Sequence, residues 1–177
     1  MKPKRYLSFL IGLIVFGGAP SWAISPDQFI NELKDKSPQL DGMSLRNYRL
    51  EDLNHDGQLE VLEVVNPIEE ASTGLLNVKL SPAFEWVNIY QKKGNEYVLA
   101  TEQFGAFLKS RKIFYVSWLK RFDEPELLDT DSQKLLRANA QQFRETLTDY
   151  VARIDHILAS ERPNKSLEPT NPAQGAR

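Results

Sequence analysis

The stretch from residue 132 to residue 159 constrains the fold more than any other part of this 177-residue chain. Asp131 or Ser132 can cap a helix at its start. Apolar residues then recur at steps of three and four, so that one apolar face runs along about eight helical turns. We expect this helix to lie across a sheet and to bury most of the core. The residues on that face are Leu135, Leu136, Asn139, Phe143, Leu147, Tyr150, Val151, Ile154, Ile157 and Leu158.

The segment that follows residue 24 predicts a short N-terminal helix and then strands. Ser25 to Gln28 has the capping-box pattern with proline at the first helical position, which predicts a helix over 26–36. This helix should end before Pro38. Side chains alternate between polar and apolar from residue 46 to residue 51, and branched residues fill 59–65, so both segments are predicted strands.

The middle of the chain predicts further antiparallel strands. Residues 66–74 are expected to form a polar connection and 75–80 a possible further strand. Residues 84–91 and 97–101 flank a turn that contains Gly94, which is the pattern of a β-hairpin.

Residues 113–119 are rich in aromatic and branched residues and predict another strand, with a helix from Ala106 onward as the alternative. The expected fold class is therefore α+β, an antiparallel sheet packed by a long C-terminal helix and a short N-terminal helix.

The N-terminus has the three-part layout of a secretory signal peptide. A basic segment, Met1 to Arg5, precedes an apolar run from Tyr6 to Phe16, which is too short to span a bilayer. Glycines and a proline follow at 17–20, and Ser21-Trp22-Ala23 provides small residues at the positions that a signal peptidase reads. We expect cleavage after Ala23, a periplasmic or secreted location, and no membrane span in the mature chain.

Composition limits the classes of function. Loss of the three cations in residues 1–23 would change the formal net charge from −2 to −5, which argues against nucleic acid as a partner. The absence of cysteine excludes disulfides, thiol nucleophiles and cysteine-ligated metals. We expect one domain over 24–160. Residues 161–177 contain three prolines and little apolar mass, which predicts a disordered tail.

Residues 52–63 fit the calcium-loop pattern D-x-[DN]-x-[DN]-G-x5-E at every fixed position. Calcium takes hard oxygen ligands, and alternate side chains around a glycine turn can converge on one ion. The candidate ligands are Asp52, Asn54, Asp56, the carbonyl of Gln58, Glu60 and Glu63.

The loop resembles those of EF-hands and of extracellular β-proteins such as the FG-GAP repeats of integrins. The resemblance covers these twelve residues alone. An EF-hand implies flanking helices, whereas the branched residues after the loop favour a strand. Because side chains alternate along a strand, Glu60 is then a better closing ligand than Glu63. The same residues can also form an acidic turn without metal.

Two other functions stay open beside an exported binding or structural protein that holds one calcium ion. The basic-aromatic segment 109–122 could bind a glycan, a lipid head group or a protein, or it could supply aromatic residues to the core. An enzyme acting on cell-envelope polymers is the other alternative. We identify no catalytic residue, because the sequence contains no G-x-S-x-G, no H-E-x-x-H, no phosphate-binding glycine loop and no Rossmann fingerprint. The expected partner is a component of the cell envelope or another protein.

Overall fold

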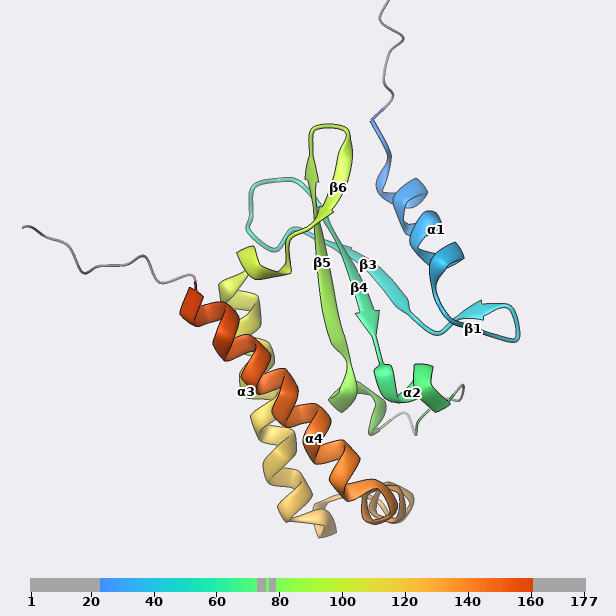
Figure 1. The fold of residues 1–177 in the computed structure, drawn as a ribbon, viewed down its shortest axis with the longest axis vertical. Coiled ribbons are helices and arrows are strands. Elements are labelled where there is room, and N and C mark those ends of the chain that lie inside the picture. The colour runs from blue at the N-terminus through green and yellow to red at the C-terminus, as the bar shows by residue number, and fades with distance from the viewer. Residues whose placement is uncertain (1–22, 73–75, 77–78, 161–177) are drawn as a thin grey trace, which may run out of the picture.

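A four-stranded antiparallel sheet forms the centre of the molecule (Figure 1). The structure is a computed structural model, which describes residues 23–72, 76 and 79–160. The predicted tail and the predicted signal segment up to residue 22 therefore lie outside the described residues. The strands lie in the order β3-β4-β5-β6, with β3 at Asn47–Glu51, β4 at Glu60–Val65, β5 at Trp86–Lys93 and β6 at Glu96–Leu99.

Helices surround this sheet and confirm the predicted α+β class. The main helices are α1 (Pro26–Lys36), α3 (Gly105–Asp123) and α4 (Thr130–Ser160). The shorter elements are a two-stranded hairpin of β1 (Gln39–Leu40) and β2 (Met43–Ser44), the helix α2 (Pro67–Ser72), and the 3-10 turns η1 (Ser81–Phe84), η2 (Thr101–Gln103) and η3 (Pro125–Leu127).

The predicted N-terminal helix is confirmed as α1, which packs on one face of the sheet. Ser25 caps it, and Ser25 and Gln28 form the complete capping box. The Phe29 ring stacks on Tyr97 and meets the edge of Tyr90, with ring centroids 4.9 and 5.2 Å apart. Side chains at alternate positions share a face, so this face also carries Val61, which is opposite Tyr90 in the register.

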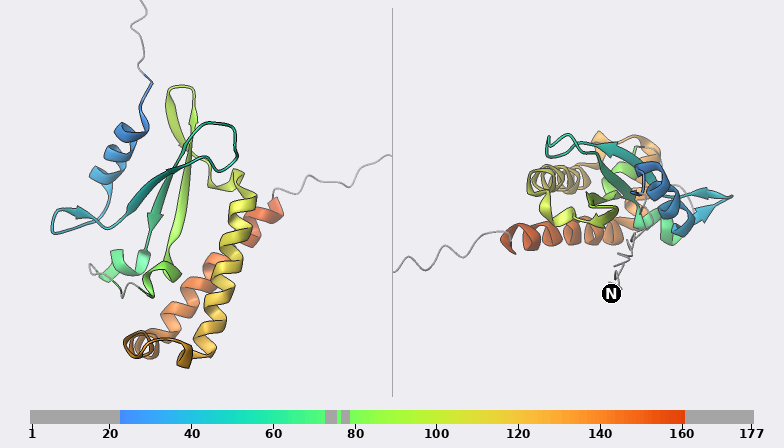
Figure 2. Two further views of the ribbon diagram at one scale, coloured as in Figure 1. Left: turned by 180° about the vertical axis from the view of Figure 1, so that it is seen from behind. Right: turned by 90° about the horizontal axis from the view of Figure 1, so that it is seen from above.

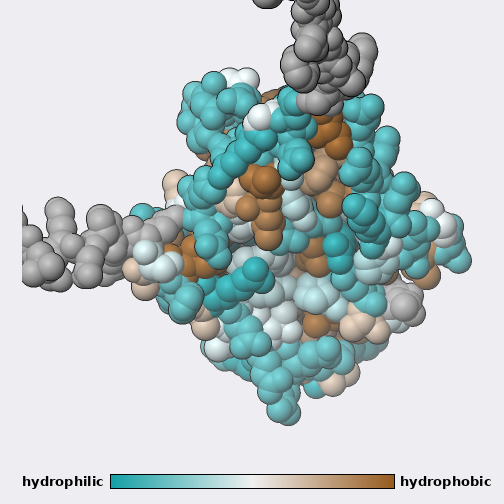
Figure 3. All heavy atoms as spheres, turned by 45° about the horizontal axis from the view of Figure 1, so that its top comes forward, coloured by the Kyte–Doolittle hydropathy of each residue, from teal (hydrophilic) through white to brown (hydrophobic). Residues whose placement is uncertain are grey.

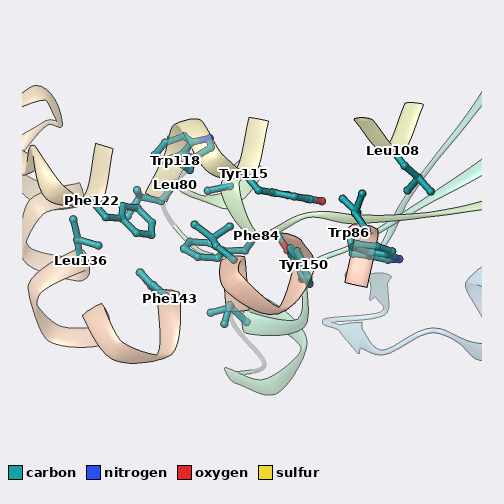
Figure 4. Close-up of a cluster of buried hydrophobic side chains, with 14 of the residues drawn as sticks. Leu80, Phe84, Trp86, Leu108, Tyr115, Trp118, Phe122, Leu136, Phe143 and Tyr150 are labelled. Carbon is teal, nitrogen blue, oxygen red and sulfur yellow. The ribbon is translucent and has the colours of Figure 1, made fainter. Parts of the chain in front are cut away.

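The helices α3 and α4 form an antiparallel hairpin whose contact surface is a large aromatic core (Figures 2 and 4). Phe143 of α4 lies 4.4 Å from the ring of Phe84, and Tyr150 lies 5.3 Å from the ring of Trp86. The predicted long helix is thus confirmed, but it packs on α3 and on the start of β5. It bends at Asn139, whose backbone leaves the helical region and whose side-chain amide donates to the carbonyl of Leu135.

The face of the sheet opposite α1 has a smaller core of its own. Leu62, Val87 and Ile89 point to that face and pack against Phe104, at the start of α3. Leu53, in the loop between β3 and β4, also packs on this cluster. The loop is therefore attached to the hydrophobic core at its second residue.

Three sequence-based predictions do not hold where the structure describes them. Residues 113–119 lie inside α3, so the strand prediction fails and the alternative helix is correct. Tyr115, Trp118 and Phe122 recur at steps of three and four and are all buried, which a helix achieves and a strand does not. The expected polar connection at 66–74 contains α2, which begins at Pro67 after the cap formed by Asn66.

The possible strand at 75–80 is not formed at its described end, because Lys79 and Leu80 lie in a turn before η1. Residues 75, 77 and 78 lie outside the described part. The predicted hairpin is confirmed as β5 and β6, and Gly94 takes a φ of 63° in its turn.

Within the described residues, no helix has the length and apolarity that crossing a membrane requires. The surface in Figure 3 is mostly hydrophilic, and its apolar side chains gather in separate patches.

Candidate functional site

The backbone of residues 52–59 forms a tight loop between β3 and β4, at the same end of the sheet as the β5–β6 turn (Figure 1). His55 and Gly57 both have positive φ angles, 60° and 84°. Glycine adopts this region without steric cost, which accounts for Gly57 at the sharpest reversal of the chain. His55 is exposed.

Carboxylate and amide oxygens inside the loop accept bonds from its own backbone. The N–H groups of Asp56 and Gly57 donate to the two oxygens of Asp52, at 3.1 and 3.0 Å. The N–H of Asp56 also donates to Asn54 Oδ1, and the N–H of Gln58 donates to Asp56 Oδ1 at 2.8 Å. The side chains of Asp52, Asn54 and Asp56 therefore bond to the backbone of the loop, and those of Asn54 and Asp56 stay exposed to solvent. These bonds also stabilise the loop without metal.

Glu60 differs from the other candidate ligands because it is fully buried, with 0% of its surface exposed. Its Oε2 accepts a 2.9 Å bond from the N–H of Leu53, so its carboxylate lies against the loop backbone. Its Oε1 is buried and has no hydrogen-bond partner among the described residues. A buried carboxylate oxygen without a donor or a cation is costly, which makes this atom the least satisfied polar group in the site.

Glu63, the last candidate ligand, lies on the other side of β4 with separate partners. Its position three residues after Glu60 directs it to the opposite face of the strand. Asn88 Nδ2 and the Tyr90 hydroxyl both donate to Glu63 Oε2 at 2.9 Å. Both its oxygens are bonded, because Arg46 Nη1 donates to Oε1 at 3.0 Å.

Of the six candidate ligands, then, the structure gathers Asp52, Asn54, Asp56 and Gln58 in the loop and Glu60 beside it, and it separates Glu63 from them. No group of three or more His, Asp or Glu side chains in the described chain is arranged to hold a metal without rearrangement. Calcium binding at this loop would therefore require Glu60 and the loop oxygens to approach one another.

Arg46 connects Glu63 to a second carboxylate. Its Nε donates to Glu70 Oε1 at 2.6 Å and its Nη2 to Glu70 Oε2 at 3.2 Å, which is the two-pronged geometry that guanidinium and carboxylate groups favour. The bond to Glu70, followed by that to Glu63, raises the pKa of Arg46 above its ordinary value. Burial, and then the charge of Glu63, raises the pKa of Tyr90. We call these residues (Arg46, Glu63, Glu70, Asn88 and Tyr90) the Glu63 cluster.

A polar groove of about 530 Å³ lies between α1 and β3, beside this cluster. Arg46 and Tyr48 form part of its wall, together with Asp27, Ile30, Asn31, Lys34 and Asn47. Glu63 itself is 1% exposed and does not line the groove. The groove therefore presents an arginine that two carboxylates already neutralise.

The basic-aromatic segment 109–122 contributes mainly to the core. Tyr115, Trp118 and Phe122 are buried between α3 and α4. Arg111 donates to the backbone carbonyl of Glu85 and stacks 4.8 Å from the Tyr115 ring. These rings are not available to stack on a ligand.

Comparison of the chain with known protein families, with curated proteins and with solved structures found no match. Any inference about function therefore depends on the chemistry of two sites, the 52–60 loop and the Glu63 cluster.

Proposed function

We propose that the protein is exported with cleavage after Ala23 and acts outside the cytoplasm as a small binding or structural protein. In this proposal its β3–β4 loop holds one calcium ion. The supporting observation is the buried Oε1 of Glu60, which has no donor among the described residues and lies next to a loop of oxygen ligands. A divalent cation is the partner that would compensate this charge.

The oxygens near the loop fit calcium in kind and number. Asp52, Asn54 and Asp56 offer side-chain oxygens, Gln58 offers its carbonyl, and a bidentate Glu60 brings the total to about six, the lower end of the range for calcium. All are hard oxygen donors, which calcium prefers. In this proposal Glu60 closes the shell, and Glu63 stays in its own cluster.

A structural role for the ion suits the position of the loop. The loop joins two paired strands, and Leu53 packs on the smaller core, on the face of the sheet opposite α1. An extracellular loop of this kind has an affinity on the order of 10⁻⁴–10⁻³ M. Such an ion would stabilise the β3–β4 hairpin and would not act as a sensor of small changes in calcium.

Calorimetry and thermal melting of the mature chain test this proposal, with calcium compared against magnesium. At about 10 mM calcium, that affinity predicts a stabilisation of about 1.4–2.7 kcal/mol. The melting temperature should rise by about 3–10 °C. Magnesium should have a smaller effect, because it demands a tighter octahedral shell and gives up its water less readily.

Variants identify the ligands. Asp52→Ala combined with Asp56→Ala should abolish both the heat of binding and the thermal shift, and Glu60→Gln should greatly reduce both. Glu51→Gln is the matched control, since Glu51 is opposite Glu60 in the register but its side chain is 50% exposed and lies outside the pattern. No calcium-dependent heat and an unchanged melting temperature at about 10 mM calcium would exclude the metal.

The alternatives receive less support from the described residues. An enzyme would need reactive groups that a substrate can reach, and Glu63 is both buried and bonded by Arg46, Asn88 and Tyr90. A glycan or lipid module using segment 109–122 would need exposed rings, whereas three of these rings lie in the core.

A further inference from the structure

The first residue after the predicted cleavage site is already bonded to the fold. The backbone nitrogen of Ile24 donates to the carbonyl of Asn95 at 3.2 Å, in the turn between β5 and β6. Ile24 is half-buried, whereas Ala23 before it is exposed. The boundary between exposed chain and bonded chain thus coincides with the bond that a signal peptidase is predicted to cleave.

This bond matters because α1 is otherwise held weakly. No residue of α1 is fully buried. Its contacts to the sheet include those of the Phe29 ring with Tyr90 and Tyr97, and that of Lys34 with the Tyr48 ring, 6.0 Å from the ring centroid. A helix with so little buried surface opens more readily than the core, so a single bond at its start can change how often it detaches.

We propose that cleavage after Ala23 strengthens this attachment, because the new α-ammonium group of Ile24 donates to the Asn95 carbonyl and fastens α1 to the β5–β6 hairpin. The proposal rests on the cleavage site in the proposed function. Hydrolysis of the Ala23–Ile24 bond by a signal peptidase consumes one water. The hydroxyl goes to the carbonyl carbon of Ala23, and the nitrogen of Ile24 gains a hydrogen and then a solvent proton, since an α-amine has a pKa of about 7.7–8.0.

Two opposing electrostatic effects determine whether the charge on the Ile24 nitrogen strengthens or weakens the attachment of α1. A cation at the start of a helix is unfavourable because it faces the positive end of the helix dipole. A hydrogen bond with a charged donor is roughly twice as strong as one between neutral groups. Asp27 lies in the first turn of α1 and partly offsets the unfavourable charge. We therefore infer that the bond to Asn95 outweighs the dipole.

Hydrogen exchange of the α1 amides tests this inference on recombinant chains that begin at Ile24 and extend to Arg177. One chain keeps a free α-amine and the other is acetylated there, which preserves the N–H and removes the charge. We expect acetylation to speed α1 exchange about threefold, because the roughly fivefold difference between a charged and a neutral donor is reduced by about 1.7-fold when the unfavourable charge at the helix start is removed as well. A control pair begins at Ser25, free or acetylated, and carries Gln28→Ala, because Gln28 Oε1 otherwise accepts a bond from the Ser25 nitrogen. Without the bonds to Asn95 and Gln28, acetylation should slow α1 exchange, because only the dipole effect remains.

The expected result is that acetylation speeds α1 exchange in the pair that begins at Ile24 and slows it in the pair that begins at Ser25. Unchanged or slower exchange on acetylation of Ile24 would overturn the proposal. N-terminal sequencing of the protein recovered from the periplasm or the medium tests cleavage separately. A start at a residue other than Ile24 would refute the cleavage site and would leave the measured strength of the attachment intact.

Discussion

At the scale of single residues, β4 places two buried glutamates in opposite situations. Glu63 accepts bonds from Arg46, Asn88 and Tyr90, so its burial is compensated by a cation and by neutral donors. Glu60 accepts one bond, from the N–H of Leu53, and its second oxygen has no described donor. Equal burial with unequal compensation distinguishes a residue that stabilises the fold from one that can bind a cation.

Glu63→Gln should therefore destabilise the fold without affecting calcium binding. Glutamine removes the charge opposite Arg46, and its amide group places a donor where Asn88 and Tyr90 also donate. We expect a loss of about 2–4 kcal/mol in the free energy of unfolding, measured with urea. The calcium-dependent rise in melting temperature should persist in Glu63→Gln. Its disappearance, in a variant that still folds, would assign Glu63 to the metal shell.

The sequence predicted the loop but not the Glu63 cluster, for a physical reason. The calcium pattern is local, and the alternation of β4 already favoured Glu60 over Glu63. Arg46, Asn88 and Tyr90 lie 17 to 27 positions away from Glu63 along the chain. Their meeting depends on the register of three strands, which one sequence does not determine. The signal available in the sequence was the spacing of Asn88 and Tyr90, which lie two positions apart in a predicted strand and therefore on the same face.

At the scale of elements, the cap of α1 was predictable, whereas the cap of α4 and the packing of α3 were not. The expected cap at Asp131 or Ser132 is wrong, because α4 begins at Thr130 and Asp129 accepts the bond from the Ser132 N–H. The capping box of α1 is encoded within four residues, so this helix began where it was expected. Segment 113–119 has strand-forming side chains, yet the helical spacing of Tyr115, Trp118 and Phe122 lets all three enter the core against α4. Packing outweighs intrinsic propensity in such a case. The helix α2 was missed although Asn66 followed by Pro67 is a helix-start signal.

The start of α4 should be sensitive to acid through Asp129. Its carboxylate accepts from the hydroxyl of Ser132 at 2.7 Å and from the Ser132 N–H at 3.2 Å. These bonds lower the pKa of Asp129 from 3.8 to about 2. Because the pKa of Asp129 is lower in the folded state than in the unfolded state, its contribution to the free energy of unfolding is present above about pH 4. This contribution is lost as the pH falls toward 2.

Asp129→Asn tests this contribution, since asparagine keeps a capping oxygen but does not titrate in this range. The melting temperature of the unmodified protein should fall more steeply between about pH 4 and pH 2 than that of the variant. Parallel curves would show that Asp129 does not contribute to the acid response. Lys134→Gln is a suitable control because the Lys134 contact to Asp131 is highly exposed.

At the scale of the whole molecule, the two cores meet along β5. Trp86 points to the aromatic core between the helices, whereas Val87 and Ile89 point to the smaller core under the opposite face. Tyrosine hydroxyls link α3 and α4 to the residues just before β5, because Tyr115 donates to the carbonyl of Glu85 and Tyr150 to that of Phe84. The helical hairpin and the sheet should therefore unfold together.

Tyrosine ionisation gives a measure of that cooperativity. Burial is the main cause that raises the pKa of all five described tyrosines: Tyr48, Tyr90, Tyr97, Tyr115 and Tyr150. A raised folded pKa means that the neutral phenol is the form that fits the fold. The contribution of these neutral phenols to the free energy of unfolding is then fully present below the ordinary tyrosine pKa of about 10 and is lost as the pH rises above it. Tyr115 and Tyr150 should ionise only when the helical core opens.

We expect phenolate absorbance in the native protein to develop above about pH 10. Its late part, from Tyr115 and Tyr150, should rise together with the loss of helical circular dichroism. In concentrated guanidinium chloride the same tyrosines should titrate near pH 10, because nothing shields them. Tyr115→Phe removes a phenol whose hydroxyl is bonded inside the core, so the late part of the titration should shrink by one group while the early part stays the same. Complete ionisation near pH 10 with the native dichroism intact would mean that the tyrosines are accessible without unfolding, and the joint unfolding of helices and sheet would then be wrong.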